Sequence, residues 1–189
     1  METLFVSTPK KVLKNYDGSQ LRPLFSYENF GLKGNAMISW ISPTDVTLDH
    51  MVDYEDKIDA QKICGDKMLH FMIEFFPANL SFGVMAQRLL ASIIKDMITQ
   101  KVASSYKLIR KGDDIYVDGG KLSISIASVS AVSTLVHFAV NITNKGTPVK
   151  TASLEDLKIK PDVFAKEVLK AFSTEFEDVI WATQKVKPL

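Results

Sequence analysis

Residues 121–128, KLSISIAS, alternate polar and apolar side chains, and this alternation restricts the fold more than any other feature of the chain. Successive side chains of a β-strand point to opposite faces, so the pattern predicts a half-buried strand. The preceding DDIYV and the Gly-Gly pair predict a strand and a turn, and LVHFAVNI predicts a further strand. Tight turns between such strands favour an antiparallel sheet.

Two further strands and two amphipathic helices are expected elsewhere. Residues 36–41 and 67–76 (KMLHFMIEFF) are rich in bulky apolar residues and bounded by Gly or Pro, which favours strands. Residues 80–100 and 160–186 repeat apolar residues at helical spacing, with Ser81 and Pro161 in positions that suit a helix start. In the first helix, the expected apolar stripe is Met85, Leu89, Ile93 and Met97, widened by Leu90, Ile94 and Ile98.

This order of elements predicts an α+β fold, in which helices pack on a mixed, largely antiparallel sheet. A chain of 189 residues suits a single domain, so we expect one domain over residues 1–189. Residues 1–15 either belong to its body or form a peripheral arm. A formal net charge of +1 and dispersed lysines and arginines predict no nucleic-acid partner. A single cysteine and the absence of a long apolar run predict a cytoplasmic protein with no membrane partner.

The stretch from Arg110 to Asn141 resembles the catalytic core of lipoyl and octanoyl transferases and of lipoate– and biotin–protein ligases. Lys121 matches the lysine of that superfamily, and HFAVNI matches its HG-x-x-LN strand, with Phe138 in place of the glycine. Over residues 16–185 the chain is closer still to a family of archaeal and bacterial proteins known only as a domain of unknown function. The matching motifs are DVTLDHMVDYED, MLHFMIEFF, QRLL, GDDIYV, KLSISIASVS and HFAVNITNKGTPVKT.

The resemblance implies a biotin–lipoate ligase-like sheet, of the kind found in class II aminoacyl-tRNA synthetases, with a cleft for an acyl chain or acyl-adenylate. Two parts of the superfamily pattern are absent. GTPVK stands where octanoyltransferases carry a nucleophilic cysteine, and Cys64 lies elsewhere. GLKGNAMISWISPTDV, with two glycines, stands in place of the glycine-rich phosphate loop of the ligases. The sequence therefore does not identify a cofactor.

Lys121 and His137 are the candidate catalytic residues. An ammonium in a narrow cleft can stabilise negative charge that develops on an acyl oxygen. Period-two spacing places Ser123 and Ser125 on the face of Lys121, and Asn141 on the face of His137 in the next strand. We expect these five polar side chains to converge on one cleft, with Leu122, Ile124 and Ile126 in the core. The alternative is a solvent-exposed polar face.

Further candidates for substrate binding are more dispersed. Asp53, Asp56, His70 and Glu74 could line a polar pocket or act with a divalent metal, but they lack the spacing of a dedicated zinc motif, so no metal ligand is assigned. Arg88, Arg110 and Asp114 could frame the mouth of the cleft, or form ordinary ion pairs at the surface.

Three hypotheses follow for the function. The first is an acyltransferase-like or ligase-like enzyme that binds a small carboxylate or acyl group at Lys121, with a carrier protein as one acceptor. The second is a non-catalytic module that binds a small ligand on the same fold. The third is a metal-assisted hydrolase that uses the Asp/His/Glu cluster. The alternating strand at residues 121–128 could also pair across a homodimer edge.

Overall fold

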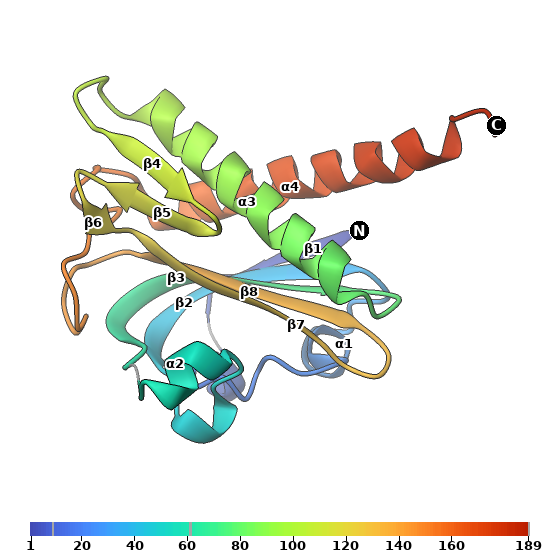
Figure 1. Ribbon diagram of the computed structural model, residues 1–189, viewed down its shortest axis with the longest axis horizontal. Coiled ribbons are helices and arrows are strands. Elements are labelled where there is room, and N and C mark those ends of the chain that lie inside the picture. The colour runs from blue at the N-terminus through green and yellow to red at the C-terminus, as the bar shows by residue number, and fades with distance from the viewer. Residues whose placement is uncertain (9, 61, 189) are drawn as a thin grey trace.

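The computed structural model describes residues 1–8, 10–60 and 62–188, and it places helices on both sides of a central sheet (Figure 1). The sheet has five strands in the order β1-β2-β3-β8-β7, and three short strands form a second sheet, β4-β5-β6. The strands are β1 (Glu2–Val6), β2 (Ala36–Asp45), β3 (Cys64–Phe75), β4 (Leu108–Lys111), β5 (Asp114–Val117), β6 (Gly120–Lys121), β7 (Ser123–Val129) and β8 (Thr134–Asn141). The helices are η1 (Lys11–Leu13), α1 (Phe25–Phe30), η2 (Leu48–His50), α2 (Tyr54–Ile58), α3 (Leu80–Lys101) and α4 (Pro161–Gln184).

The strand directions confirm the mixed, largely antiparallel sheet. β2, β3, β8 and β7 pair antiparallel to their neighbours, and β1 pairs parallel to β2 at one edge. The sequence leaves open a peripheral arm over residues 1–15, but Glu2–Val6 of this segment form that edge strand. None of the helices among the described residues combines the length and the apolar character that a membrane crossing needs.

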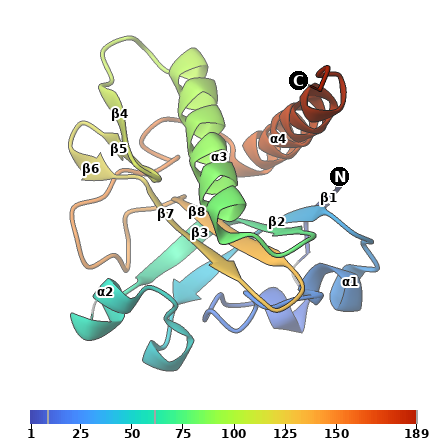
Figure 2. The same cartoon turned by 45° about the vertical axis from the view of Figure 1, so that its right-hand side comes forward.

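The two faces of the central sheet bury different segments of the chain. The long helices α3 and α4 cover one face, where Phe71 and Phe138 pack against them (Figures 1 and 2). The N-terminal segment crosses the other face, where Tyr16 packs with Trp40 and Met72. The second face is only partly covered, and this leaves room for the site described below.

The helix α3 lies where the sequence predicts it, but its buried face is rotated from the expected centre. Leu90, Ile94 and Ile98 are fully buried, whereas Met85 is 63% exposed. The side chain of Asn79, rather than the expected Ser81, caps the helix by accepting a hydrogen bond from Phe82 N at 2.9 Å. The row of Leu90, Ile94 and Ile98, expected beside the main apolar stripe, is thus the centre of the buried face, because the helix packs on the sheet along that row.

The segment around residue 122 departs from the predicted single strand. Lys121 belongs to β6 in the small sheet, and the chain enters the central sheet at Ser123. Leu122 joins the two sheets, since its N–H donates to Ile115 O at 2.8 Å and its carbonyl accepts from Asn141 N at 2.9 Å. A Cβ on Gly120 would lie 2.8 Å from backbone atoms of Thr151, so this turn accommodates only glycine without a shift of the backbone.

Candidate functional site

A cavity of about 500 Å³ opens on the partly covered face of the sheet, a volume within the range of small-molecule sites. Its walls come from β3, β7 and β8, from the small sheet, from the segment that contains η2 and α2, and from the loop after β8. Figure 2 shows α2 and β6 at the same end of the central sheet, with this loop between them. The apolar part of the wall includes Leu21, Val46, Met51, Met68, Ile124 and Ile126.

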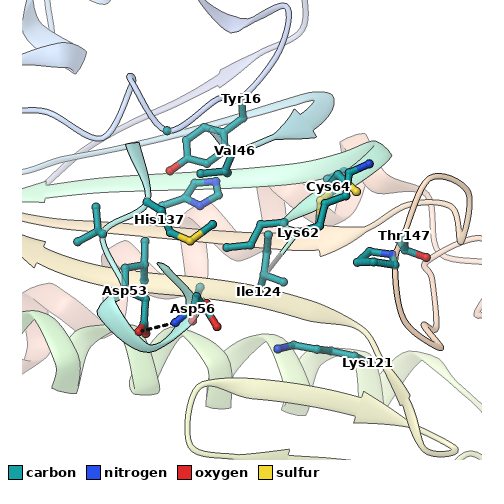
Figure 3. Close-up of a pocket in the computed structure, with 18 of the residues that line it drawn as sticks. Tyr16, Val46, Asp53, Asp56, Lys62, Cys64, Lys121, Ile124, His137 and Thr147 are labelled. Carbon is teal, nitrogen blue, oxygen red and sulfur yellow. Dashed lines mark hydrogen bonds between the residues drawn. The ribbon is translucent and has the colours of Figure 1, made fainter. Parts of the chain in front are cut away.

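Lys121 projects toward the cavity from β6, opposite Tyr16 and His137 (Figure 3). Its Nζ lies 2.9 Å from Asp114 Oδ2, and both side chains are partly exposed, at 32% and 24%. The Tyr116 hydroxyl donates to the same carboxylate oxygen at 3.1 Å. The amine predicted to project into the cleft therefore lies at its wall and is already paired with an acid.

Carboxylates outnumber lysines around this part of the cavity. Asp53, Asp56, Asp113 and Asp114 line it together with Lys62 and Lys121. Burial raises the pKa of the Asp56 carboxyl above its ordinary value, and the Asp53 charge adds to the rise while Lys121 opposes it. Asp56 is thus more easily protonated than an ordinary aspartate, and a carboxyl of this kind can exchange a proton with a ligand.

Two buried histidines form a relay behind the cavity. His70 Nε2 lies 3.1 Å from the Ser42 carbonyl oxygen, and His70 Nδ1 lies 3.1 Å from His137 Nε2. Burial lowers the pKa of His70 to about 4, and it lowers the pKa of His137 well below the ordinary histidine value. Both rings are therefore neutral at pH 7, so His137 provides polar atoms and no positive charge.

Aromatic rings enclose this pair. The Tyr16 ring stacks on His137 with centroids 3.7 Å apart and an interplanar angle of 12°, and Trp40 stacks on His70 at 4.8 Å. His137 is 2% exposed and lines the cavity, whereas His70, on the same sheet face of the neighbouring strand β3, does not line it. His70 was expected in the substrate pocket; it instead holds His137 through the hydrogen bond between their rings.

Asn141 holds the end of β8 against the neighbouring segments. Its Nδ2 donates to Lys121 O at 3.0 Å and to Ala152 O at 3.3 Å. The Ala152 backbone N–H also donates to Lys121 O, at 3.1 Å. Asn141 lines the cavity, as predicted, but its amide is engaged in fixing the backbone that carries Lys121.

Of the two serines predicted to converge with Lys121, Ser125 lines the cavity and Ser123 does not. Ser123 is fully buried and its hydroxyl accepts from Ile115 N at 2.9 Å. Ser125 Oγ donates to Asp113 Oδ2 at 2.7 Å and meets only the edge of the cavity. The period-two count fails because the chain changes sheets at Leu122, so the isoleucines of β7 face the cavity. Ile126 lies opposite His137, and Ile124 lies opposite Ala139.

Three further candidates lie away from the cavity. The Glu74 carboxylate is buried and accepts from Leu24 N at 2.8 and 3.1 Å, which anchors the start of α1. Arg88 is exposed on α3, and the exposed Arg110 donates to the Gly112 carbonyl. Because Glu74 lies apart from Asp53 and Asp56, the predicted Asp/His/Glu cluster does not form. The described residues contain no group of three or more metal-ligating side chains.

Several cavity residues had no signal in the sequence. Tyr16 comes from a turn-rich segment, and it reaches the site because its backbone pairs with Thr44 beside β2. Cys64 stands outside the superfamily pattern, yet it lines the cavity with its thiol donating to Gly146 O at 3.0 Å. Such placements depend on long-range chain crossings that no local pattern encodes.

Comparison with known proteins agrees with this fold. The family model described as domain of unknown function DUF366 matches residues 5–187. The chain is 31% identical over 183 residues to the uncharacterized protein MJ0805 of Methanocaldococcus jannaschii, covering 93% of this chain and 81% of that protein. A protein of unknown function from Pyrococcus horikoshi superposes with a TM-score of 0.90 at 33% identity, over the full length of both chains.

More distant structures share the architecture. Biotin protein ligase from Aquifex aeolicus, in complex with biotin and ATP, gives a TM-score of 0.57 at 11% identity, over 93% of this chain and 70% of that one. A bi-partite lipoate protein ligase from Thermoplasma acidophilum gives 0.58 at 12% identity, over 92% and 82%. The chain therefore belongs to DUF366, a family of unknown function, and it has the fold of the biotin and lipoate protein ligases.

Proposed function

We propose that the cavity binds a small carboxylic acid or its acyl derivative, with the carboxyl or acyl carbon beside the Lys121 ammonium. The observation that carries this proposal is the position of Lys121, which is partly buried at the wall of a cavity that also presents methionine and isoleucine side chains. Methionine and isoleucine side chains suit the body of an apolar acid, and an ammonium donates charge-assisted hydrogen bonds to a carboxylate or carbonyl oxygen.

The fold supports the same ligand class. The ligase from A. aeolicus was crystallised with biotin and ATP, and a second lipoate protein ligase structure from T. acidophilum carries lipoic acid. Biotin and lipoic acid are both carboxylic acids with an apolar body. The proposal transfers only this general class to the present chain, because the distant likeness supports the fold and does not identify one acid.

The cavity also holds groups that suit acyl transfer to an acceptor. In such a reaction a nucleophile of the acceptor would attack the acyl carbon, and the bond from that carbon to the leaving group would break. As negative charge develops on the carbonyl oxygen of the acyl group, the Lys121 ammonium would donate a hydrogen bond to that oxygen. Asp56, whose pKa is raised, would accept the proton of the nucleophile. An amine on a carrier protein would be an acceptor of this type.

Binding is tested by calorimetric titration of the protein with octanoate, lipoate and biotin, each with and without ATP. Loss of a hydrogen bond to a charged group costs about 1.5–3 kcal/mol, so Lys121→Ala should weaken carboxylate binding by about tenfold or more. Lys170→Ala makes the same charge change on the exposed surface of α4 and should leave affinity unchanged. Binding that is equally strong in the Lys121→Ala and Lys170→Ala variants would contradict the role of Lys121.

A second substitution should change the carboxylate affinity in the opposite direction. Asp114 holds Lys121 in an ion pair, so Asp114→Asn should release the ammonium and tighten carboxylate binding several-fold. The same titration measures this effect. A weaker affinity in Asp114→Asn would mean that the ligand needs the ion pair intact, and the proposed contact with Lys121 would be wrong.

The second candidate function is a non-catalytic binding module on the same fold. The observation that favours it is the lack of an activated nucleophile: Lys121 is paired with Asp114, and the Cys64 thiol donates to a backbone carbonyl. Incubation with acyl thioesters or acyl-adenylates and an amine acceptor separates the two. Turnover by the unmodified protein that Lys121→Ala abolishes at saturating substrate supports the enzyme; binding by the unmodified protein without turnover supports the module.

A further inference from the structure

The end of the cavity opposite Lys121 is built from two stacked polar rings (Figure 3). Tyr16 and His137 are 3% and 2% exposed, and both line the cavity. Across residues 1–8, 10–60 and 62–188, neither the Tyr16 hydroxyl nor His137 Nδ1 has a hydrogen-bond partner. Both residues line the cavity, and neither atom is enclosed by protein, so both are open to a hydrogen bond with a ligand in the cavity.

The histidine relay fixes which atoms can donate. A carbonyl oxygen only accepts, so His70 Nε2 carries a proton and donates to Ser42 O. His70 is neutral, hence its Nδ1 is an acceptor and His137 Nε2 must donate to it. His137 is neutral as well, which leaves its Nδ1 without a proton. The deep end of the cavity therefore offers a hydrogen-bond acceptor at His137 and a hydroxyl at Tyr16.

We infer that the ligand carries an uncharged hydrogen-bond donor at the end remote from its carboxyl group, and that an amide-like group suits this position best. Its N–H would donate to His137 Nδ1, and its carbonyl would accept from the Tyr16 hydroxyl. This inference rests on the proposed function for the orientation of the ligand, since the carboxyl end is assigned to Lys121. It narrows the substrate class from acids in general to acids with a polar, neutral head.

Two other kinds of head group fit less well. A methyl terminus, as in a simple fatty acid, would bury both ring atoms without a partner. A second carboxylate would place a negative charge against the lone pair of His137 Nδ1. The chemistry of the two rings thus separates ligands that share the same length and the same carboxyl end.

The test uses four eight-carbon acids that differ only in the remote group: octanoate, 8-hydroxyoctanoate, suberic acid monoamide and suberate. Titration calorimetry of the intact protein should give the tightest binding for the monoamide, about threefold to tenfold tighter than octanoate, with suberate weakest. Tyr16→Phe removes a hydroxyl that has no protein partner, so it should leave the melting temperature unchanged and reduce the preference for the monoamide. His137→Phe should reduce it further.

Hexanamide, which has no carboxyl group, separates this inference from the proposed function. Its binding should shift the ¹⁵N signal of the unprotonated His137 Nδ1. If this shift occurs while none of the acids binds, the inference stands and the proposed function fails. If the acids bind with equal affinity, or the preference survives in both Tyr16→Phe and His137→Phe, the inference is overturned. Absence of both the shift and acid binding overturns both proposals.

Discussion

At the scale of single residues, the polar side chains around the site divide into those that meet the cavity and those that hold the fold. Lys121, His137 and Asn141 lie on the cavity wall, as their resemblance to the ligase superfamily implies. Glu74, taken from the sequence as a pocket residue, instead binds the backbone N–H of Leu24, which has a left-handed φ of 61° just before α1. The sequence identifies an acid on a strand, but it does not show where its carboxylate points.

A pair of substitutions tests this division. Glu74→Ala leaves the partly buried Leu24 N–H without its carboxylate acceptor, so the free energy of unfolding should fall by about 1–3 kcal/mol, while ligand affinity stays unchanged. Asp56→Asn, at the partly exposed cavity wall, should alter ligand affinity and change stability by less than about 0.5 kcal/mol. Urea denaturation and titration calorimetry measure the two quantities. A loss of ligand affinity in Glu74→Ala, together with a loss of stability in Asp56→Asn, would show that Glu74 belongs to the site.

At the scale of elements, the sequence predicts the type and order of the long strands and helices well. The reason is physical, because both signals are local: residues 80–100 keep the helical period, and KMLHFMIEFF is a short run of bulky apolar residues that ends before Pro77. The errors arise where one segment serves two elements. The alternation of KLSISIAS continues across Leu122, although the chain changes sheets there, so Ser123 is buried away from the cavity while Ile124 and Ile126 line it.

The helix α3 gives a direct check of its buried face. Leu90→Ala removes a fully buried side chain that packs on the sheet, and the cost should be about 2–5 kcal/mol. Met85 was expected to lie on the central stripe but is 63% exposed, so Met85→Ala should change stability by less than about 0.5 kcal/mol. Thermal or urea unfolding of the two variants measures both values. Equal losses would show that the helix packs along the stripe predicted from the sequence.

At the scale of the whole molecule, the site depends on contacts between distant parts of the chain. Tyr16, His70 and His137 come from three segments, and their stack on the second face of the sheet could not be read from any local pattern. The resemblance to known families supplied the architecture and Lys121, because it summarises long-range structure. Tyr16 and Cys64 were found only in the structure, whereas Asp53, Asp56 and Asp114 of the acidic wall were already candidates from the sequence.

The buried histidines also predict how stability depends on pH. Their pKa values are lowered in the folded protein, that of His70 from 6.5 to about 4, so the unfolded chain binds more protons in this window. Full stability is therefore present above about pH 6.5 and is lost as the pH falls toward 4. One proton per histidine gives a slope of at most about 2.7 kcal/mol per pH unit. Urea denaturation from pH 7.5 to 5 measures it, and a flat profile would contradict the neutral relay.

His50 provides the matched control for this experiment. It is exposed, and it is the remaining histidine of the chain besides His70 and His137. His50→Gln should retain the slope of the unmodified protein, because the relay of His70 and His137 remains intact. A slope that disappears in His50→Gln would assign the pH dependence to the wrong histidine.

The most direct measurement of the central claim is a crystal structure of the protein with suberic acid monoamide. The account predicts the ligand in the cavity between β7, β8 and α2, with its carboxylate within hydrogen-bond distance of Lys121 Nζ and its amide at Tyr16 and His137. A ligand bound outside this cavity, or one whose carboxylate lies against His137, would contradict it.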